Sequence, residues 1–535
     1  MRTFPMQAVR RIGCRALLAA PLLLLAPGCT DLSEVPHEAL TPTNAFKTDV
    51  EILAGVAGVY ANLRDVEWVG YMTLNDITTD VMVIPTRGND WYDNGRWLEI
   101  HRQTWTANSG SALDDMNGAW NSLFSGVAKA NLMIDVVSKN AGTNSAGYLA
   151  ELRTLRAWYY YMLMDMFGGV PLATTPELKQ YARATRKDVF DFVEKELTEA
   201  AAALPATRPA SEYGRVTKGA ANSILAALYL NAGVFGKNEG VNATGYNSCT
   251  TVQVTGGKSG CQAAVDAADA VINSGRYSLN PDWKRNFTNN RTSPENIFVI
   301  VHTSEQGLGG NWPMRTLHYN QLNTGQGSPW NGIATLAETY NAFTATDVRR
   351  SMWLVGQQKS FETGNDVTDR NGNALKFTVD IPDVDAAGEA TGVRFNKFEP
   401  LPSAPSGNGH PYDFPFFRLS EMHLIRAEAL NELGQTGAAI TALKLVHDLR
   451  DPGTPIAAGL SSQQVRDAIL KERLLEFSGE GKRRTDMVRH GKFLTWTEAS
   501  THGHVSQAAK PHLILFPIPA TQLQSNPLLT QNPGY

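Results

Sequence analysis

The sequence predicts a mainly α-helical protein in which helical hairpins form a scaffold and long loop-rich insertions carry the ligand surface. Two observations predict this fold class. Apolar residues recur every three or four positions over long stretches, as in helices with one buried face. Other stretches are rich in glycine, asparagine and tryptophan, and they lie near 65–115, 234–260, 280–335 and 355–412. Irregular segments of this length are uncommon in compact domains unless they have a function.

The first 28 residues have the pattern of a secretory signal peptide. Four arginines precede the apolar run 16–27, and Gly28 and Cys29 follow it. The run is too short for a membrane span, which needs about 20 apolar residues. We expect residues 1–28 to be removed and Cys29 to carry lipid at the new amino terminus, as in bacterial lipoproteins. The alternative is an ordinary signal peptide with an incidental cysteine, and in either case the protein leaves the cytoplasm.

Residues 29–535 are expected to form a single domain. Removal of residues 1–28 takes away four arginines and no acidic residue, so 44 basic and 52 acidic residues remain and the net charge is about −8. This balance argues against a nucleic-acid partner, which would need clustered positive charge. No other stretch of the sequence is long and apolar enough to cross a bilayer.

Predicted helices occur in pairs near 47–235, 262–275 and 416–480. The first keeps Val50, Leu53 and Tyr60 on one face, and another ends where Gly168 permits a left-handed cap. Further helices are predicted at 187–204, 217–231, 262–274, 416–433, 436–450 and 461–478. Helix–turn–helix units of this size, stacked side by side, are the tetratricopeptide arrangement.

Two cysteines remain besides Cys29 and Cys14 of the signal segment. Cys249 and Cys261 lie 12 residues apart in an insertion rich in glycine, serine and threonine. Outside the cytoplasm they could form one local disulfide, and the alternative is two free thiols. No metal site is expected there, because no histidine or third cysteine lies nearby.

Five segments resemble, in order, the motifs of the SusD/RagB family. They are RTLRAWYYYMLMDMFGGVPL (153–172), GRVTKGAA (214–221), RLSEMHLIRAEALNELG (418–434), ERLLEFSGEGKRRTD (472–486) and the tail segments FPIP (516–519), NP (526–527) and QNPGY (531–535). Each motif alone is moderately specific, and all five in order are strong evidence. The similarity covers essentially the whole chain after the signal segment.

This resemblance implies a tetratricopeptide-like fold and a role in nutrient uptake. Proteins of the family are surface lipoproteins of the outer membrane that pair with a SusC-like TonB-dependent transporter. They bind nutrient, usually glycan, and are not enzymes. The resemblance therefore implies a glycan ligand, a transporter partner, a lipid-anchored position at the cell surface and no cofactor.

Aromatic residues in two insertions are the candidate ligand contacts. Flat rings can stack on the apolar faces of sugars, while nearby arginine, asparagine and aspartate side chains hydrogen-bond the hydroxyl groups. By resemblance, SusD-like proteins gather an aromatic arc from the same regions. The candidate residues are Arg87, Trp91, Tyr92, Trp97, Trp312, Tyr319 and Trp330. The alternative is that these rings only fasten long loops onto the helices.

Most enzyme signatures are absent from the sequence. No serine lies in a G-x-S-x-G motif and no H-E-x-x-H motif occurs. Paired acids such as Asp114 with Asp115, or Glu472 with Glu476, neither prove nor disprove a glycosidase, which needs two carboxyl groups close in space. A non-enzymatic binding protein is therefore expected. The alternatives are an envelope glycosidase on a helical scaffold and, less favoured, a helical-repeat adaptor with only protein partners.

Overall fold

The computed structural model describes residues 45–535 except 141, 143, 239, 305–307, 324–327, 403–409 and 499–502. The predicted signal segment and Cys29 lie outside the described residues, so the expectation for both stays a prediction. Residues 46–535 form one compact unit. In the described part, none of the helices combines the length and the apolar character that a bilayer crossing requires.

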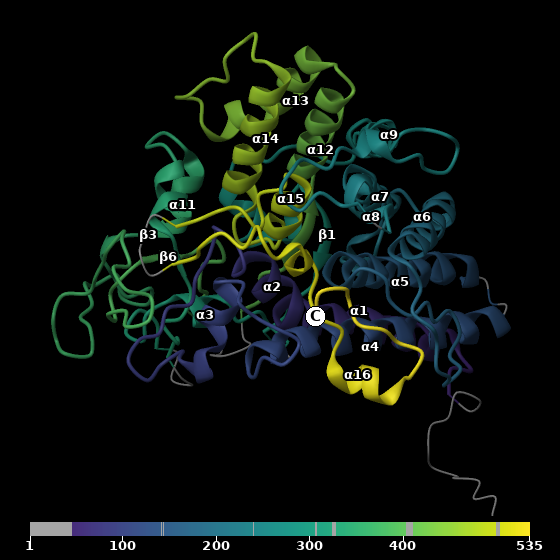
Figure 1. The fold of residues 1–535 in the computed structure, drawn as a ribbon, viewed down its shortest axis with the longest axis horizontal. Coiled ribbons are helices and arrows are strands. Elements are labelled where there is room, and N and C mark those ends of the chain that lie inside the picture. Colours follow the sequence, from purple (N-terminus) through teal and green to yellow (C-terminus); the bar gives the residue numbers. More distant parts are fainter. Residues whose placement is uncertain are drawn as a thin grey trace, which may run out of the picture. The chain divides into compact units, whose positions relative to one another are not determined.

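Nine long helices of the described part form the scaffold, and each packs against the next along the chain (Figure 1). They are α1 (Asp49–Val66), α4 (Ala112–Lys139), α5 (Ser145–Phe167), α6 (Arg186–Ala203), α7 (Lys218–Leu230), α9 (Gly260–Ile272), α12 (Leu419–Glu432), α13 (Thr436–Arg450) and α14 (Ser462–Phe477). This arrangement confirms the predicted mainly helical fold of stacked hairpins.

Local sequence explains where these helices begin and end. Thr48, Thr185 and Ser461 start α1, α6 and α14 with capping boxes, in which the hydroxyl accepts from a backbone N–H one turn later. Gly168 and Gly434 follow α5 and α12 with φ of 75° and 76°. Glycine adopts this left-handed conformation without a steric cost, so both helices end as predicted.

The core is built around α5, which is buried along most of its length. Trp158 of α5 meets the edge of Phe416 with ring centroids 4.7 Å apart, so the helices pack directly on a strand. Tyr159 donates to the carbonyl oxygen of Val59 in α1 at 2.8 Å. Gly126 of α4 makes room for this tyrosine, because a Cβ there would lie 2.4 Å from Cζ of the ring.

Shorter elements connect the long helices. The short α-helices are α2 (Thr73–Asp76), α3 (Arg96–His101), α8 (Ala232–Phe235), α10 (Trp312–Thr316), α11 (Ala337–Ala342), α15 (Arg483–Arg489) and α16 (Ala520–Ser525). A π-helical segment (Glu67–Met72) continues α1. The 3₁₀ turns are Asp93–Gly95, Ala210–Glu212, Cys249–Thr251, Trp283–Asn286, Asn290–Thr292, Val348–Met352 and Pro511–Ile514.

Three small antiparallel sheets lie in the loop-rich part of the chain. β1 (Asn296–Ile300) pairs with β7 (Phe414–Arg418), with Ile300 opposite Phe414. The second sheet has the order β2–β6–β3, and β4 pairs with β5. These strands are β2 (Ala334–Thr335), β3 (Trp353–Leu354), β4 (Gly356–Gln357), β5 (Lys376–Phe377) and β6 (Val393–Phe395).

The largest insertion separates two helices that are neighbours in space. α9 and α12 pack together, although residues 273–418 lie between them in the sequence. Those residues contain all three sheets and return to the scaffold through the β1–β7 pair. The chain therefore leaves the helical stack after α9 and returns to it at α12, which packs directly on α9.

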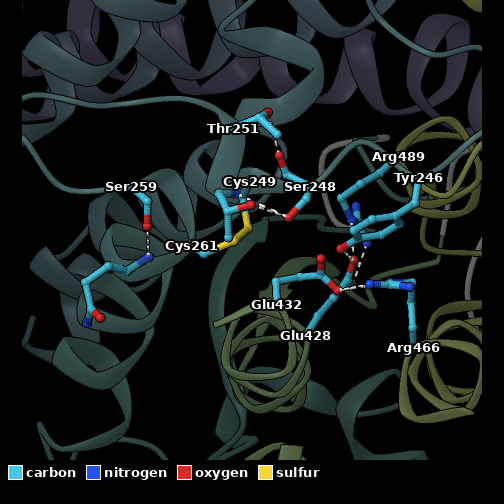
Figure 2. The surroundings of a disulfide bond; sticks show 12 residues. Tyr246, Ser248, Cys249, Thr251, Ser259, Cys261, Glu428, Glu432, Arg466 and Arg489 are labelled. Atoms are coloured by element: carbon cyan, nitrogen blue, oxygen red, sulfur yellow. Dashed lines mark hydrogen bonds and ion pairs between the residues drawn. A yellow bond between two sulfur atoms is a disulfide. The ribbon is translucent and has the colours of Figure 1, made fainter. Parts of the chain in front are cut away.

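A disulfide fastens the insertion before α9 (Figure 2). Cys249 and Cys261 are bonded and both are fully buried. Ser259 caps the start of α9 by accepting from the backbone N–H of Gln262 at 3.3 Å. Tyr246 reaches α12 and donates to Glu428 at 3.0 Å. The segment before α9 is thus bonded to α9 through the disulfide and to α12 through Tyr246, so it links the two helices.

We expect the double variant Cys249→Ser/Cys261→Ser to unfold with a free energy about 3 kcal/mol below that of the wild type. The bond closes a short loop with a sequence separation of 12, and opening such a loop releases about that much chain entropy in the unfolded state. Urea denaturation with and without reductant measures the difference. Reductant should lower the midpoint of the wild type and leave that of the double variant unchanged. Equal midpoints for the oxidised wild type and the double variant would contradict a stabilising bond.

Candidate functional site

Two loops far apart in the sequence meet on the loop-rich side of the protein. Trp91 Nε1 donates to the carbonyl oxygen of Trp330 at 2.7 Å, and the Tyr319 hydroxyl donates to Asp90. We call the resulting group the aromatic surface. It consists of Asp90, Trp91, Tyr92, Tyr319 and Trp330, with Arg315 and Arg370 beside the rings. The structure therefore brings together four of the seven predicted ligand residues.

The rings of this surface differ in how far they reach solvent. Tyr92 is 57% exposed and Trp330 is 37% exposed, whereas Trp91 is half-buried. Arg315 lies under the Trp330 ring, with its Cζ 5.1 Å from the ring centroid. This cation–π contact stabilises the ring of a residue that is partly exposed to solvent.

Backbone geometry explains how Trp91 reaches this position. Its φ is +61°, a value that residues with a side chain rarely adopt. The indole lies against Gly332, where a Cβ would approach Cε2 of Trp91 to 2.5 Å. Glycine at this position therefore lets Trp91 of one loop lie on the backbone of the other loop. This contact and the Trp91 hydrogen bond hold the two loops together.

Charged side chains frame Tyr319. The guanidinium of Arg370 lies 4.2 Å from the Tyr319 ring centroid and pairs with Asp90 and Glu389, each at 3.3 Å. Partial burial and the hydrogen bond to Asp90 raise the pKa of Tyr319 to about 12, so its hydroxyl stays protonated and donates at neutral pH. About half of the Arg370 side chain is exposed. Donors and acceptors for sugar hydroxyl groups thus lie around the partly exposed ring of Tyr319.

Three of the predicted ligand contacts are wrong, because the structure buries them. Trp97 is 5% exposed and donates to Asp93 at 2.6 Å. Trp312 is 4% exposed and stacks on Phe398, with centroids 5.5 Å apart and planes 17° from parallel. Arg87 is buried and donates to the carbonyl oxygen of Thr391 at 3.0 Å. For these three, burial favours the alternative of loop fastening.

Sequence reasoning missed Arg370 and Glu389. Both lie in the insertion near 355–412, which carries no aromatic cluster to mark it. Their importance comes from contact with Tyr319 and Asp90, some 50 to 300 residues away in sequence. Only an arginine in an irregular segment could have signalled this role, and many such residues are merely solvated.

Three of the four acids considered for hydrolysis are buried in ion pairs, whereas Asp114 is exposed. Glu472 and Glu476 are buried and pair with Arg349 at 2.6 and 3.0 Å. Burial alone would raise their pKa values, but the arginines outweigh it and lower both. Asp115 is also buried and pairs with Arg96 at 2.6 Å. None of the three is placed to transfer a proton to a sugar.

Comparison with known proteins identifies the family. Residues 266–535 match the model described as the SusD family. The chain belongs to the SusD family. Residues 39–230 of this SusD-family protein also match a model described as starch-binding and associating with the outer membrane. Together the two matches extend over most of the described chain.

Relatives of this SusD-family protein match along most of their length. SusD-like protein P2 of Formosa agariphila is 25% identical over 545 residues, covering 96% of this chain and 98% of the relative. Starch-binding protein SusD of Bacteroides thetaiotaomicron is 24% identical, covering 76% of each chain. The structure of surface glycan-binding protein A from Bacteroides thetaiotaomicron with laminarihexaose has a TM-score of 0.69 at 22% identity, covering 91% of this chain and all of that chain. That likeness shows the fold.

Proposed function

We propose that this protein binds a glycan at the aromatic surface without cleaving it. The observation that carries the proposal is that two joined loops expose the rings of Tyr92 and Trp330, while Asp90 and Arg370 lie at the ring of Tyr319. Rings stack on the apolar faces of sugars and the charged groups bond the hydroxyls. Related proteins named for starch binding or solved with laminarihexaose support a glycan ligand.

The proposed location is the outer membrane, with the protein lipid-anchored and exposed at the cell surface. A family description that names association with the outer membrane supports this location. Lipid on Cys29 would hold the protein there, as the pattern of the first 29 residues predicts. The partner proposed by resemblance is a SusC-like TonB-dependent transporter, which would take the bound glycan from this protein.

We expect Trp330→Ala to weaken glycan binding at least tenfold, which corresponds to about 1.4 kcal/mol. The variant removes a ring face that Arg315 holds in place, and it should leave thermal stability unchanged because the ring is partly exposed. Isothermal calorimetry with a panel of soluble glycans, starting with starch and laminarin oligosaccharides, measures the affinity.

Two controls sharpen this experiment. Trp330→Phe keeps a stacking face and should retain most of the affinity, while Leu445→Ala removes an exposed apolar side chain from α13 and should change nothing. Equal affinity of Trp330→Ala and the wild type would remove the aromatic surface from the site. Release of shorter sugars by the wild-type protein would instead favour the glycosidase.

A further inference from the structure

A groove of about 480 Å³ lies between α1, the turn before α7 and the end of β1. Its walls are mainly aliphatic, and its polar lining includes two arginines. The aliphatic lining residues are Leu53, Val56, Ala57, Ala61, Leu63, Val299 and Val301. Pockets for small ligands have this size range and this mixture of apolar walls with few polar groups. The groove shares no lining residue with the aromatic surface.

The chain builds this groove with two glycines. Gly214 has φ of +85°, and a Cβ there would lie 2.2 Å from Cγ2 of Val301, so only glycine lets the turn close this wall. Gly58 faces the groove from α1, and a Cβ at this position would meet no atom within 4 Å. The space beside α1 is therefore open to a ligand, whereas the opposite wall is tightly packed.

The exposed face of α1 at this groove is unusually apolar. Leu53 is 39% exposed, and Ala57 and Gly58 next to it are also exposed. No charged residue interrupts this face until Arg64, eleven residues after Leu53. An apolar ligand in the groove would remove this surface from water, which is favourable in proportion to the area covered.

One positive charge at the groove has no carboxylate partner in the described part of the chain. Arg215 pairs with Glu151 and Glu212, and Arg208 pairs with the same two acids. These four charges balance. Arg64 donates from Nη1 to the carbonyl oxygen of Val301 at 3.0 Å, which leaves its other N–H groups and its charge available.

We propose that this groove binds an aliphatic carboxylate. The hydrocarbon chain lies along Leu53, Ala57 and Val299, and the carboxylate pairs with Arg64 at the end of the groove. The aliphatic walls select the chain, and the single uncompensated cation selects one negative charge. This site is separate from the glycan surface, so the two can be tested independently.

Decanoate and decanol, each below its micellar concentration, test this proposal. Titration calorimetry with the folded protein should give a submillimolar Kd for decanoate and binding at least tenfold weaker for decanol, which has the same chain without the charge. Arg64→Leu should weaken decanoate binding at least tenfold and leave decanol unchanged. Absence of decanoate binding at millimolar concentration, or equal binding of both probes to the wild type, would overturn the proposal.

A blocking variant separates the groove from nonspecific binding. Gly58→Phe places a ring in the open space and should abolish binding of both probes without lowering the melting temperature, because glycine is unfavourable inside a helix. Gly437→Phe on α13 is the matched control, since Gly437 is also an exposed helical glycine with open space around it. Unchanged decanoate binding by Gly58→Phe would overturn the proposal, whatever the result for glycan binding.

Discussion

Replacing Arg418 by methionine is expected to lower the free energy of unfolding by about 3–5 kcal/mol. Arg418 at the end of β7 is almost completely buried, and its guanidinium pairs with Glu476 at 2.8 Å and Glu480 at 2.7 Å. It also pairs with Glu295. Methionine keeps most of the volume but leaves three buried carboxylates short of a positive charge, and a buried unpaired charge is strongly unfavourable.

The effect is large because Arg418 is the centre of a wider buried network. Glu295 also pairs with Arg450 of α13 at 2.9 Å, and Glu480 pairs with Lys397 at 2.6 Å. Glu476 of α14 also pairs with Arg349 of the 3₁₀ turn Val348–Met352 at 3.0 Å. These contacts join the long helices to the largest insertion, so the loss of one cation weakens the attachment of several segments.

Arg426→Met provides the matched control on the neighbouring helix α12. Arg426 pairs with Asp269 at 2.7 Å, but about a third of each side chain is exposed. Surface pairs of this kind contribute about 0–1 kcal/mol. Urea denaturation of both variants gives the loss in free energy of unfolding, which is calculated from the midpoint and slope of each curve. Similar losses for Arg418→Met and Arg426→Met would contradict the role of the buried network.

Acid is expected to destabilise the protein steeply as the pH falls below about 4.5. Five buried carboxyl groups have lowered pKa values because nearby cations, mainly arginines, outweigh burial, which alone would raise the pKa. They are Glu295, Glu428, Glu472, Glu476 and Asp486. A carboxyl group with a lower pKa in the folded state stabilises the fold above its unfolded pKa. That stabilisation is lost as the pH falls through the folded pKa.

The slope of the free energy of unfolding against pH follows from the number of these carboxyl groups. Each group contributes at most about 1.4 kcal/mol per pH unit, so five groups together contribute up to about 7 kcal/mol per pH unit where all of them titrate. The midpoint of urea denaturation, measured at intervals from pH 8 to pH 3, tests this expectation. A midpoint that stays constant from pH 6 to pH 3.5 would contradict it.

Asp76 acts in the opposite direction and provides a control. Burial raises the pKa of Asp76 to about 7, against a backbone hydrogen bond from Gly481 that lowers it. A raised folded pKa gives stability that is present below 3.8 and lost as the pH rises through about 7. Asp76→Asn keeps a neutral side chain, so the stability of this variant relative to the wild type should increase as the pH rises from 4 to 7.

The helical scaffold was largely predictable because its signals are local. Periodicity and caps identified α6, α12 and α13 to within a few residues, and they identified the end of α5. Periodicity did not single out α4, the 28-residue helix that packs on α5. Gly126 of this helix is a residue type that disfavours helices, yet its lack of a side chain makes room for Tyr159 of the neighbouring helix. A contact between helices decides that role, and no local pattern shows it.

The candidate site was predictable as a region but not residue by residue. Trp312 and Trp330 lie in the same insertion, and the structure buries the first against Phe398 and exposes the second. In the other loop, Trp97 faces inward from α3 while Tyr92 reaches solvent. Composition places aromatic rings in a loop, but long-range packing decides which face of each ring is free.

The side-by-side contact of α9 and α12 across the long excursion has an evolutionary consequence. Because these helices meet directly, loops of the stretch between them that lie outside the buried ion-pair network and the β1–β7 pair can change in length and sequence while the stack keeps its own contacts. Natural selection can thus exchange recognition loops and retain the framework. An inherited frame of this kind fits a TM-score of 0.69 to a protein that shares 22% of its residues.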